Sequence, residues 1–179
     1  MGANVDAPNK LEQWMNDERA MRDRLGPTGV ATKEQLRDRS GIEFLEGIGR
    51  GELPGPPIGE LMGFLPIECE PGRVVFQGTP GPQHYNPLGS VHGGYAATLL
   101  DSCVGCAVHS MLPAGKGYTT LELKVNFIRA LTNAVGPVRA EGKVVSLGGQ
   151  IGIAEGRLTD SNGKLYAFAT TTCLVFPIL

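Results

Sequence analysis

The spacing of hydrophobic residues changes along the chain. Up to about residue 55 the apolar positions follow helical spacing, and from residue 58 alternating stretches typical of strands appear, with one long helical stretch among them. The apolar positions of that stretch are Ala96, Leu99, Leu100, Cys103, Val104, Ala107, Val108 and Met111. Their i, i+3, i+4 spacing predicts a helix that packs into a core.

Three helix-start signals occur in the first fifty residues. In each, a capping residue is followed three positions later by Glu or Gln; the pairs are Asn9 with Glu12, Thr32 with Gln35 and Ser40 with Glu43. Residues 47–57 are rich in Gly and Pro, which is typical of a linker. We therefore expect an N-terminal helical extension over residues 1–55 and a main domain over residues 56–179. The extension is either an added structural layer or oligomer contact, or a lid over a pocket.

Six stretches have the pattern of strands. They are residues 58–67, 73–77, 118–129, 138–147, 150–159 and 164–176. Short separators at residues 70–72, 148–149 and 162–163 predict hairpin turns and therefore antiparallel pairing. One long helix packed on one antiparallel sheet is an α+β architecture.

Asp101 interrupts the apolar pattern of the long helix. Burying a carboxylate costs free energy unless it is paired or protonated, so an acid between Leu100 and Val104 requires an explanation. Its neighbours on the helix face are small: Gly94, Ala97, Thr98 and Gly105. Small residues let a backbone or a ligand approach closely, which predicts a narrow site at Asp101. The alternative is a structural acid paired with a backbone group or a buried Arg.

Two glycines, Gly93 and Gly94, stand at the predicted start of this helix. We expect their N–H groups to be unpaired and free of side-chain cover. Such an end favours negative charge, and an N–H aimed at a carbonyl oxygen stabilises the oxyanion formed when an acyl group is attacked. Gly93 and Asp101 lie roughly 12 Å apart along one helix, at about 1.5 Å per residue. Two antiparallel helices across a two-fold axis would bring Gly93 of one subunit near Asp101 of the other, which predicts a homodimer with shared sites.

The stretch before and along this helix resembles the hotdog-fold acyl-CoA thioesterases, specifically their PaaI-like branch in the 4-hydroxybenzoyl-CoA thioesterase superfamily. In that family an Asn, a Gly, the triplet His-Gly-Gly and an Asp recur in this order. Here they correspond to Asn86, Gly89, His92-Gly93-Gly94 and Asp101. The resemblance covers roughly residues 55–176. It implies the hotdog fold, in which an antiparallel sheet wraps around a long central helix.

The resemblance also implies a role for each matching residue. Asp101 would be the general base or the nucleophile, and the Gly93 N–H would polarise the thioester carbonyl. Asn86 and His92 would organise the loop and the attacking water. Thr120 matches a Ser or Thr position that orients this water. For His92 a second interpretation is open, in which it only braces the loop through backbone hydrogen bonds.

Substrate contacts are expected from Gly94 and Arg129. Relatives of this branch often carry an Arg near the turn at residues 148–150, which we associate with the CoA phosphates, but this chain has Gly-Gly-Gln there. Arg129, Arg139 and Lys143 are the basic residues that could replace it; the alternative for each is a solvated surface role.

These residues together predict an acyl-CoA thioesterase that hydrolyses an aryl-acyl or medium-chain acyl thioester to the free acid and CoA. Neither base catalysis nor direct attack by Asp101 needs a cofactor or a metal. Two alternatives are open. A hotdog enoyl-CoA hydratase or dehydratase would need His92 or His84 to face Asp101, and a non-catalytic acyl-CoA-binding module would have no use for the acid. The assembly is either a homodimer or a dimer of dimers, a homotetramer.

Composition and charge exclude several classes of function. The chain has 179 residues, of which 41% are hydrophobic and 19% charged, which is enough for one domain with an extension. A net charge of −2 gives no electrostatic reason to bind nucleic acid or a membrane surface. No stretch reaches the roughly 18 apolar residues of a membrane span. Residues 1–6 lack the features of a signal peptide or a myristoylation site, so we expect a cytoplasmic protein.

The four cysteines, Cys69, Cys103, Cys106 and Cys173, are sparse and lie in apolar patterns, so they are predicted to be buried thiols. Cys103 and Cys106 have the spacing of a metal or redox pair. No second pair or suitably spaced His accompanies them, so we expect no metal site.

Overall fold

The computed structural model describes residues 9–179, and the expectation about residues 1–6 lies outside this range. Its helices are α1 (Lys10–Arg22), α2 (Lys33–Arg37), α3 (Gly41–Gly49), α4 (Pro57–Met62) and α5 (Gly93–His109). Its strands are β1 (Phe64–Glu70), β2 (Arg73–Gly78), β3 (Lys116–Phe127), β4 (Val138–Leu147), β5 (Ile151–Asp160) and β6 (Leu165–Pro177). Two short 3₁₀ turns lie at Pro82–His84 and Asn133–Val135.

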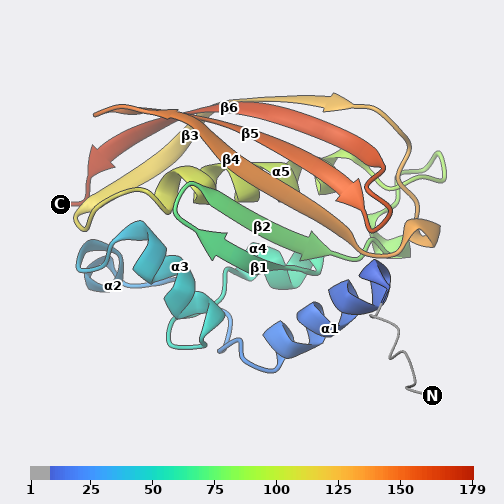
Figure 1. Ribbon diagram of the computed structural model, residues 1–179, viewed down its shortest axis with the longest axis horizontal. Coiled ribbons are helices and arrows are strands. Elements are labelled where there is room, and N and C mark those ends of the chain that lie inside the picture. The colour runs from blue at the N-terminus through green and yellow to red at the C-terminus, as the bar shows by residue number, and fades with distance from the viewer. Residues whose placement is uncertain (1–8) are drawn as a thin grey trace, which may run out of the picture.

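The six strands form one antiparallel sheet in the order β1-β2-β4-β5-β6-β3. The sheet curves around α5, which packs against every strand (Figure 1). A long helix wrapped by an antiparallel sheet is the predicted α+β architecture, and this prediction is confirmed.

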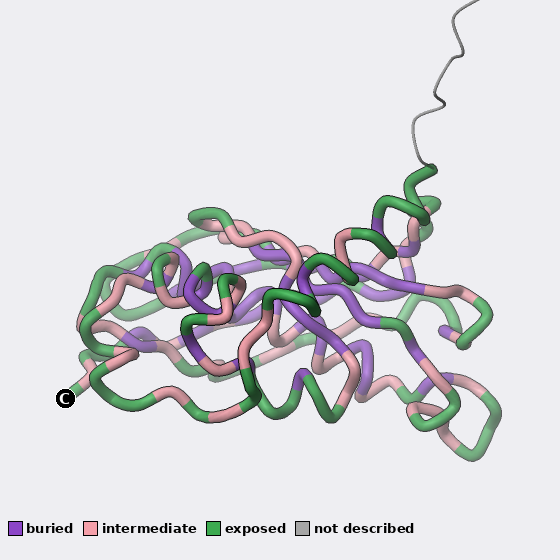
Figure 2. Tube along the Cα trace, turned by 90° about the horizontal axis from the view of Figure 1, so that it is seen from below, coloured by how far each residue is buried: buried purple, intermediate pink, exposed green. Residues whose placement is uncertain are grey.

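The core lies between α5 and the sheet, where buried segments run through the centre of the molecule (Figure 2). Leu99, Leu100 and Val104 are fully buried, as the helical spacing predicted. Gly142 on β4 faces the Cys103 carbonyl so closely that no Cβ would fit, which explains a glycine in the middle of a strand. Met111 follows the end of α5 and is exposed, so it does not belong to the core.

The strand predicted over residues 58–67 is partly wrong. Its first half is helix α4, and only its second half belongs to β1. Pro57 suits the first turn of a helix, and Gly63 ends it in the left-handed conformation with φ +68°. A short apolar run fits a helix or a strand equally well by periodicity alone. The linker predicted over residues 47–57 is also partly wrong, because it includes the end of α3 and the start of α4.

The helix starts predicted at Asn9, Thr32 and Ser40 are confirmed, and these residues are the N-caps of α1, α2 and α3. Helix α1 packs on β1, and α3 packs on both β1 and α5. Two backbone hydrogen bonds attach α2 and α3 to the segment that follows α5. The Gly41 N–H donates to the Leu112 carbonyl, and the Gly115 N–H donates to the Arg37 carbonyl. The N-terminal helices therefore cover one edge of the sheet and the C-terminal end of α5.

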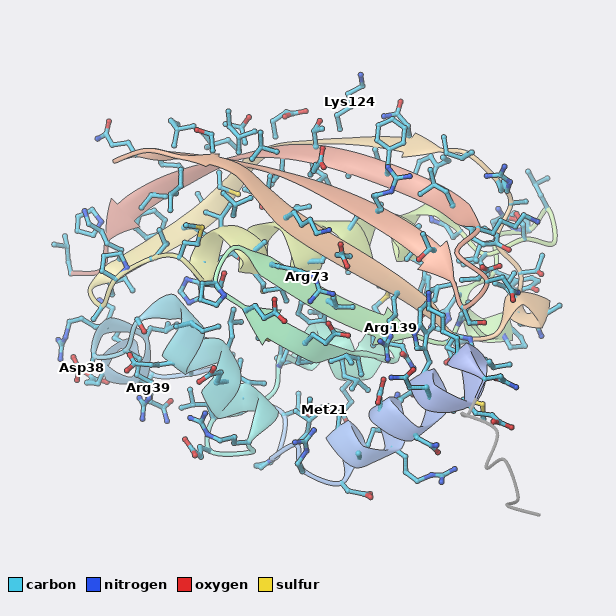
Figure 3. All side chains as sticks on the ribbon, in the orientation of Figure 1. Met21, Asp38, Arg39, Arg73, Lys124 and Arg139 are labelled. Carbon is cyan, nitrogen blue, oxygen red and sulfur yellow. The ribbon has the colours of Figure 1, made fainter. Side chains whose placement is uncertain are left out.

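A buried polar cluster joins α1 to the sheet. The guanidinium of Arg139 lies 4.5 Å over the ring of Trp14, pairs with Asp17 at 2.6 Å and donates to Gln77 Oε1 at 2.8 Å. Gln77 is fully buried and donates to the Trp14 carbonyl at 3.0 Å and to Glu18 at 2.9 Å. Figure 3 shows Arg139 on the sheet beside α1. The cluster satisfies buried polar groups from both elements and so fixes the position of α1.

Candidate functional site

The loop before α5 is organised by the side chain of Asn86. Its Oδ1 accepts hydrogen bonds from the N–H groups of Leu88 at 2.9 Å and Ser90 at 3.3 Å, and its Nδ2 donates to Ser90 Oγ at 3.1 Å. Gly89 completes the turn with φ +84°, a conformation that favours glycine. This loop sets where the chain enters α5.

His92 is the N-cap of α5, and its Nδ1 accepts a hydrogen bond from the Gly94 N–H at 2.9 Å. The expectation that the Gly94 N–H is unpaired is therefore wrong. Within residues 9–179 the N–H of Gly93 has no acceptor. Gly93 nevertheless lies under a side chain, because a Cβ on it would be 3.0 Å from Cζ of Phe127. Phe127 was not predicted as a site residue, since alternation along the sequence places it on a strand but does not reveal which loop it faces.

A pocket of about 370 Å³ opens beside this helix start, and we call it the Gly93 pocket. Asn86, His92, Gly93, Phe127 and Arg129 are among its lining residues. The Arg129 side chain is exposed, and its Nη1 donates to the Leu165 carbonyl at 2.6 Å. Four of the residues predicted for the site from sequence thus surround one pocket.

Asp101 lies two turns further along α5 and does not line the Gly93 pocket. It is half-buried, and its Oδ1 accepts a hydrogen bond from Thr120 Oγ1 on β3 at 2.9 Å. In the part of the chain that the structure describes, the Asp101 carboxylate has no other hydrogen bond or ion pair. It is therefore not held by a backbone group or a buried Arg of its own chain.

The histidines other than His92 belong to the packing. The Nδ1 of His84 accepts from the Gly81 N–H at 3.0 Å, and its ring lies 4.4 Å from that of Tyr95. Burial lowers the pKa of His84, and it lowers the pKa of His109 to about 4. The hydratase alternative requires His84 or His92 to face Asp101. Within one chain, neither histidine forms a hydrogen bond with this carboxylate in the described residues.

Two of the three basic residues considered for the CoA phosphates, Arg139 and Lys143, form ion pairs with acidic side chains. Arg139 is buried in the cluster with Trp14, and that proposal for it was wrong. Lys143 pairs with Glu141 at 2.5 Å. Arg129 alone borders the Gly93 pocket.

All four cysteines have free thiols. Burial raises the pKa of Cys69 to about 11 and that of Cys106 to about 12, so both thiols stay protonated near neutral pH. Within the described range, residues 9–179, no three side chains of His, Cys, Asp or Glu gather in a way that could hold a metal ion. None of the helices in that range is both long and apolar enough to cross a bilayer.

Comparison with known proteins places this geometry in a family. The sequence profile described as the thioesterase superfamily matches residues 88–167. A protein of Saccharolobus solfataricus named as a candidate esterase is 34% identical over 104 residues, which are 58% of this chain and 71% of that protein. The chain belongs to the thioesterase superfamily. A candidate esterase of Halobacterium salinarum is 42% identical to this thioesterase over 69 residues, which span 37% of the chain and only 44% of that protein.

Similar solved structures indicate to which branch of the superfamily this thioesterase belongs. A Ralstonia eutropha protein named as a candidate thioesterase related to phenylacetic acid degradation has a TM-score of 0.67 and 27% identity, and covers 73% of this chain and 98% of that one. The PaaI protein of Thermus thermophilus has a TM-score of 0.60 and 26% identity, covering 66% and 97%. A Streptococcus mutans protein bound to acetyl-CoA has a TM-score of 0.58 and 25% identity, covering 64% and 90%. The chain is a PaaI-like hotdog thioesterase, and membership assigns it to the thioester hydrolases.

Proposed function

We propose that this protein hydrolyses acyl-CoA thioesters at sites shared by two subunits of a homodimer. One observation carries the proposal: roughly 12 Å along α5 separate the Gly93 N–H, which has no acceptor among residues 9–179, from the carboxylate of Asp101. Each half of the site is incomplete within one chain. A second, antiparallel α5 completes both halves at once.

The edge of the sheet supports this assembly. Strand β3 is an edge strand of 12 residues, and Leu121 and Phe127 are each 58% exposed on it. A long edge with exposed apolar side chains is a natural pairing surface. Pairing two β3 edges about a two-fold axis joins the sheets and sets the two α5 helices antiparallel. Phe127, which lies against Gly93, then borders the shared site.

The chemistry assigns complementary roles to the two halves. The Gly93 N–H receives the thioester carbonyl oxygen at the positive end of α5 and stabilises the oxyanion. Thr120 holds Oδ1 of Asp101, which leaves Oδ2 free to take a proton from water or to attack the carbonyl carbon. On the base route the water attacks the carbonyl carbon, the carbon–sulfur bond breaks, and the proton held by Asp101 passes to the sulfur, which gives the free acid and the CoA thiol. On the direct route the carbon–sulfur bond breaks as a mixed anhydride with Asp101 forms and CoA leaves as its thiolate; water then hydrolyses the anhydride, which releases the free acid and restores Asp101. A positioned carboxylate base contributes roughly 10²- to 10⁴-fold in rate.

Arg129 is the proposed contact for the CoA phosphates, because its guanidinium is exposed at the border of the Gly93 pocket. A guanidinium suits a phosphate through paired hydrogen bonds. The acetyl-CoA bound to the related Streptococcus mutans protein supports a CoA thioester as substrate. We also propose residues 56–179 as the thioesterase domain and residues 1–55 as its extension.

A pair of inactive variants tests the shared site. Gly93 is the first residue of α5, and His92 before it is extended at φ −60° and ψ 137°, so proline fits there. Gly93→Pro removes the N–H, while the control Gly93→Ala keeps it and meets Phe127 in a similar way. We expect Asp101→Asn and Gly93→Pro each to abolish release of free CoA, and Gly93→Ala to retain most of it.

Mixing the two inactive proteins under subunit exchange is the decisive step. Each mixed dimer holds one intact site, so an equal mixture recovers about a quarter of the wild-type activity. Recovery supports the shared site. Absence of recovery, with subunit exchange verified, contradicts it, and absence of hydrolysis by the wild-type protein on any acyl-CoA contradicts the function itself.

A further inference from the structure

An apolar chamber of about 390 Å³ lies between the N-terminal helices and the C-terminal end of α5. Leu36 on α2 and residues such as Phe44 and Ile48 on α3 line one side, and His109 and Tyr118 lie on the other. This volume falls within the range of small-molecule sites. Nothing in the site described above uses the chamber.

The chamber begins on the same face of α5 as Asp101. Asp101, Gly105 and His109 are four residues apart in turn and so lie along one face of the helix. At about 1.5 Å per residue, His109 lies roughly 12 Å beyond Asp101. A ligand bound at Asp101 that extends along this face toward the C-terminal end of α5 therefore extends toward the chamber.

Strand β3 follows the same line. Thr120, which donates to Asp101, and Tyr118 are two residues apart and point to the same side of the strand. The Tyr118 ring packs directly on Gly105, where an added Cβ would come 2.7 Å from the ring. The same ring lies 5.4 Å from that of His109. Tyr118 thus lies between the carboxylate and the chamber, and the absence of a side chain at Gly105 is what lets its ring take this position.

One polar group in the chamber wall has no partner. His109 is 6% exposed, and its Nδ1 has no hydrogen-bond partner among residues 9–179. Burial keeps this imidazole neutral at neutral pH, because it lowers its pKa to about 4.

We propose that the chamber holds the far end of the substrate's acyl group, and that α2 and α3 close over it. This inference rests on the proposed thioesterase function and names its substrate class: an extended, uncharged acyl chain of medium length. A short arylacetyl group would end near Asp101 and leave the chamber empty. A chain with a terminal carboxylate is excluded, because the apolar wall offers no cation to pair with it.

Filling the chamber tests the proposal. Leu36→Trp adds volume from the half-buried α2 side, and Leu36→Ala removes it. The matched control is Leu61→Trp on α4, where Leu61 is 77% exposed. The assay is free-thiol release from acetyl-, butanoyl-, octanoyl- and dodecanoyl-CoA, with calorimetric binding of decanoic acid as a readout that does not depend on catalysis.

We expect Leu36→Trp to lower kcat/KM for octanoyl- and dodecanoyl-CoA by about tenfold or more, to leave butanoyl-CoA unchanged and to abolish decanoic acid binding. Leu36→Ala should shift the preference toward dodecanoyl-CoA, and Leu61→Trp should change nothing. Equal effects of Leu36→Trp on short and long substrates would overturn the proposal while leaving the hydrolysis intact. If no acyl-CoA is hydrolysed, the proposed function fails, and loss of decanoic acid binding in Leu36→Trp still supports the chamber as the tail site.

Discussion

The hydroxyl of Thr120 on β3 donates a hydrogen bond of 2.9 Å to Oδ1 of Asp101 on α5. It is the only polar contact of this carboxylate within residues 9–179, and it fixes one oxygen while leaving the other free. The bond joins the central helix to the edge strand that we propose as the dimer contact. The orientation of the proposed catalytic acid thus depends on a residue outside the helix.

Replacing Thr120 by Val removes this donor at nearly constant volume. On the proposed mechanism we expect kcat for acyl-CoA hydrolysis to fall about tenfold, which corresponds to about 1.4 kcal/mol of lost positioning. Steady-state kinetics with free-thiol detection measures it. Thr120→Ser keeps the hydroxyl and should retain most of the activity. An unchanged kcat in Thr120→Val would show that the hydrogen bond does not orient Asp101 for the reaction.

Variants of His92 distinguish its two proposed roles, bracing the loop and organising the attacking water. The bracing role follows from its Nδ1, which caps α5 by accepting from the Gly94 N–H. We expect His92→Ala to lower the free energy of unfolding by about 1 kcal/mol through loss of the cap. His92→Asn should preserve stability, since Asn is a good N-cap. Urea denaturation measures both. If bracing is its whole role, His92→Asn also keeps kcat; an active-site contribution would appear as a loss of kcat in a fully stable variant.

Arg139 holds α1 on the sheet through Trp14, Asp17 and Gln77. Arg139→Met leaves buried Gln77 Oε1 without its donor and Asp17 without its cation. We expect a loss of about 2–3 kcal/mol in stability, less than for a fully buried pair because Asp17 is partly exposed. Trp14 is the only tryptophan and is 5% exposed, so its fluorescence reports the docking of α1.

A red shift of that fluorescence before global unfolding is the expected signature of α1 leaving the sheet. Arg50→Met is the matched control, because within residues 9–179 Arg50 pairs only with exposed Glu46 and Glu52, and it should leave the spectrum unchanged. Wild-type fluorescence and stability in Arg139→Met would contradict the role of the cluster.

Burial of His109 makes stability depend on pH. Its pKa is about 4 in the folded protein and about 6.5 when unfolded, so the unfolded chain binds more protons between these values. The stabilisation is fully present above pH 6.5 and is lost as the pH falls toward 4, by about 3 kcal/mol. Phe44 and Tyr118 face the ring. Urea unfolding of wild type and His109→Phe at pH 7.5 and 4.5 should give a smaller pH effect in the variant; equal effects would contradict this origin.

The sequence by itself determined the features that depend on local spacing. The capping pairs beginning at Asn9, Thr32 and Ser40 located three helices, and the apolar period located α5. The sequence also determined the distance between Gly93 and Asp101 along the helix, because the rise per residue of a helix is constant. The family resemblance came from the same short stretch of chain.

Tertiary structure alone decided the contacts between residues far apart in the chain. Alternation predicted a strand over residues 58–67, whereas residues 57–62 form helix α4, which packs on β1. From sequence, Arg139 was either a solvated surface residue or a substitute phosphate ligand, and the structure instead pairs it with Asp17, 122 residues away. The position of Phe127 over Gly93 and the chamber beside Tyr118 likewise depend on how strands and helices pack. Helix caps and side-chain periodicity depend on residues a few positions apart, so the sequence shows them directly. Packing partners lie far apart in the sequence and come into contact only when the whole chain folds.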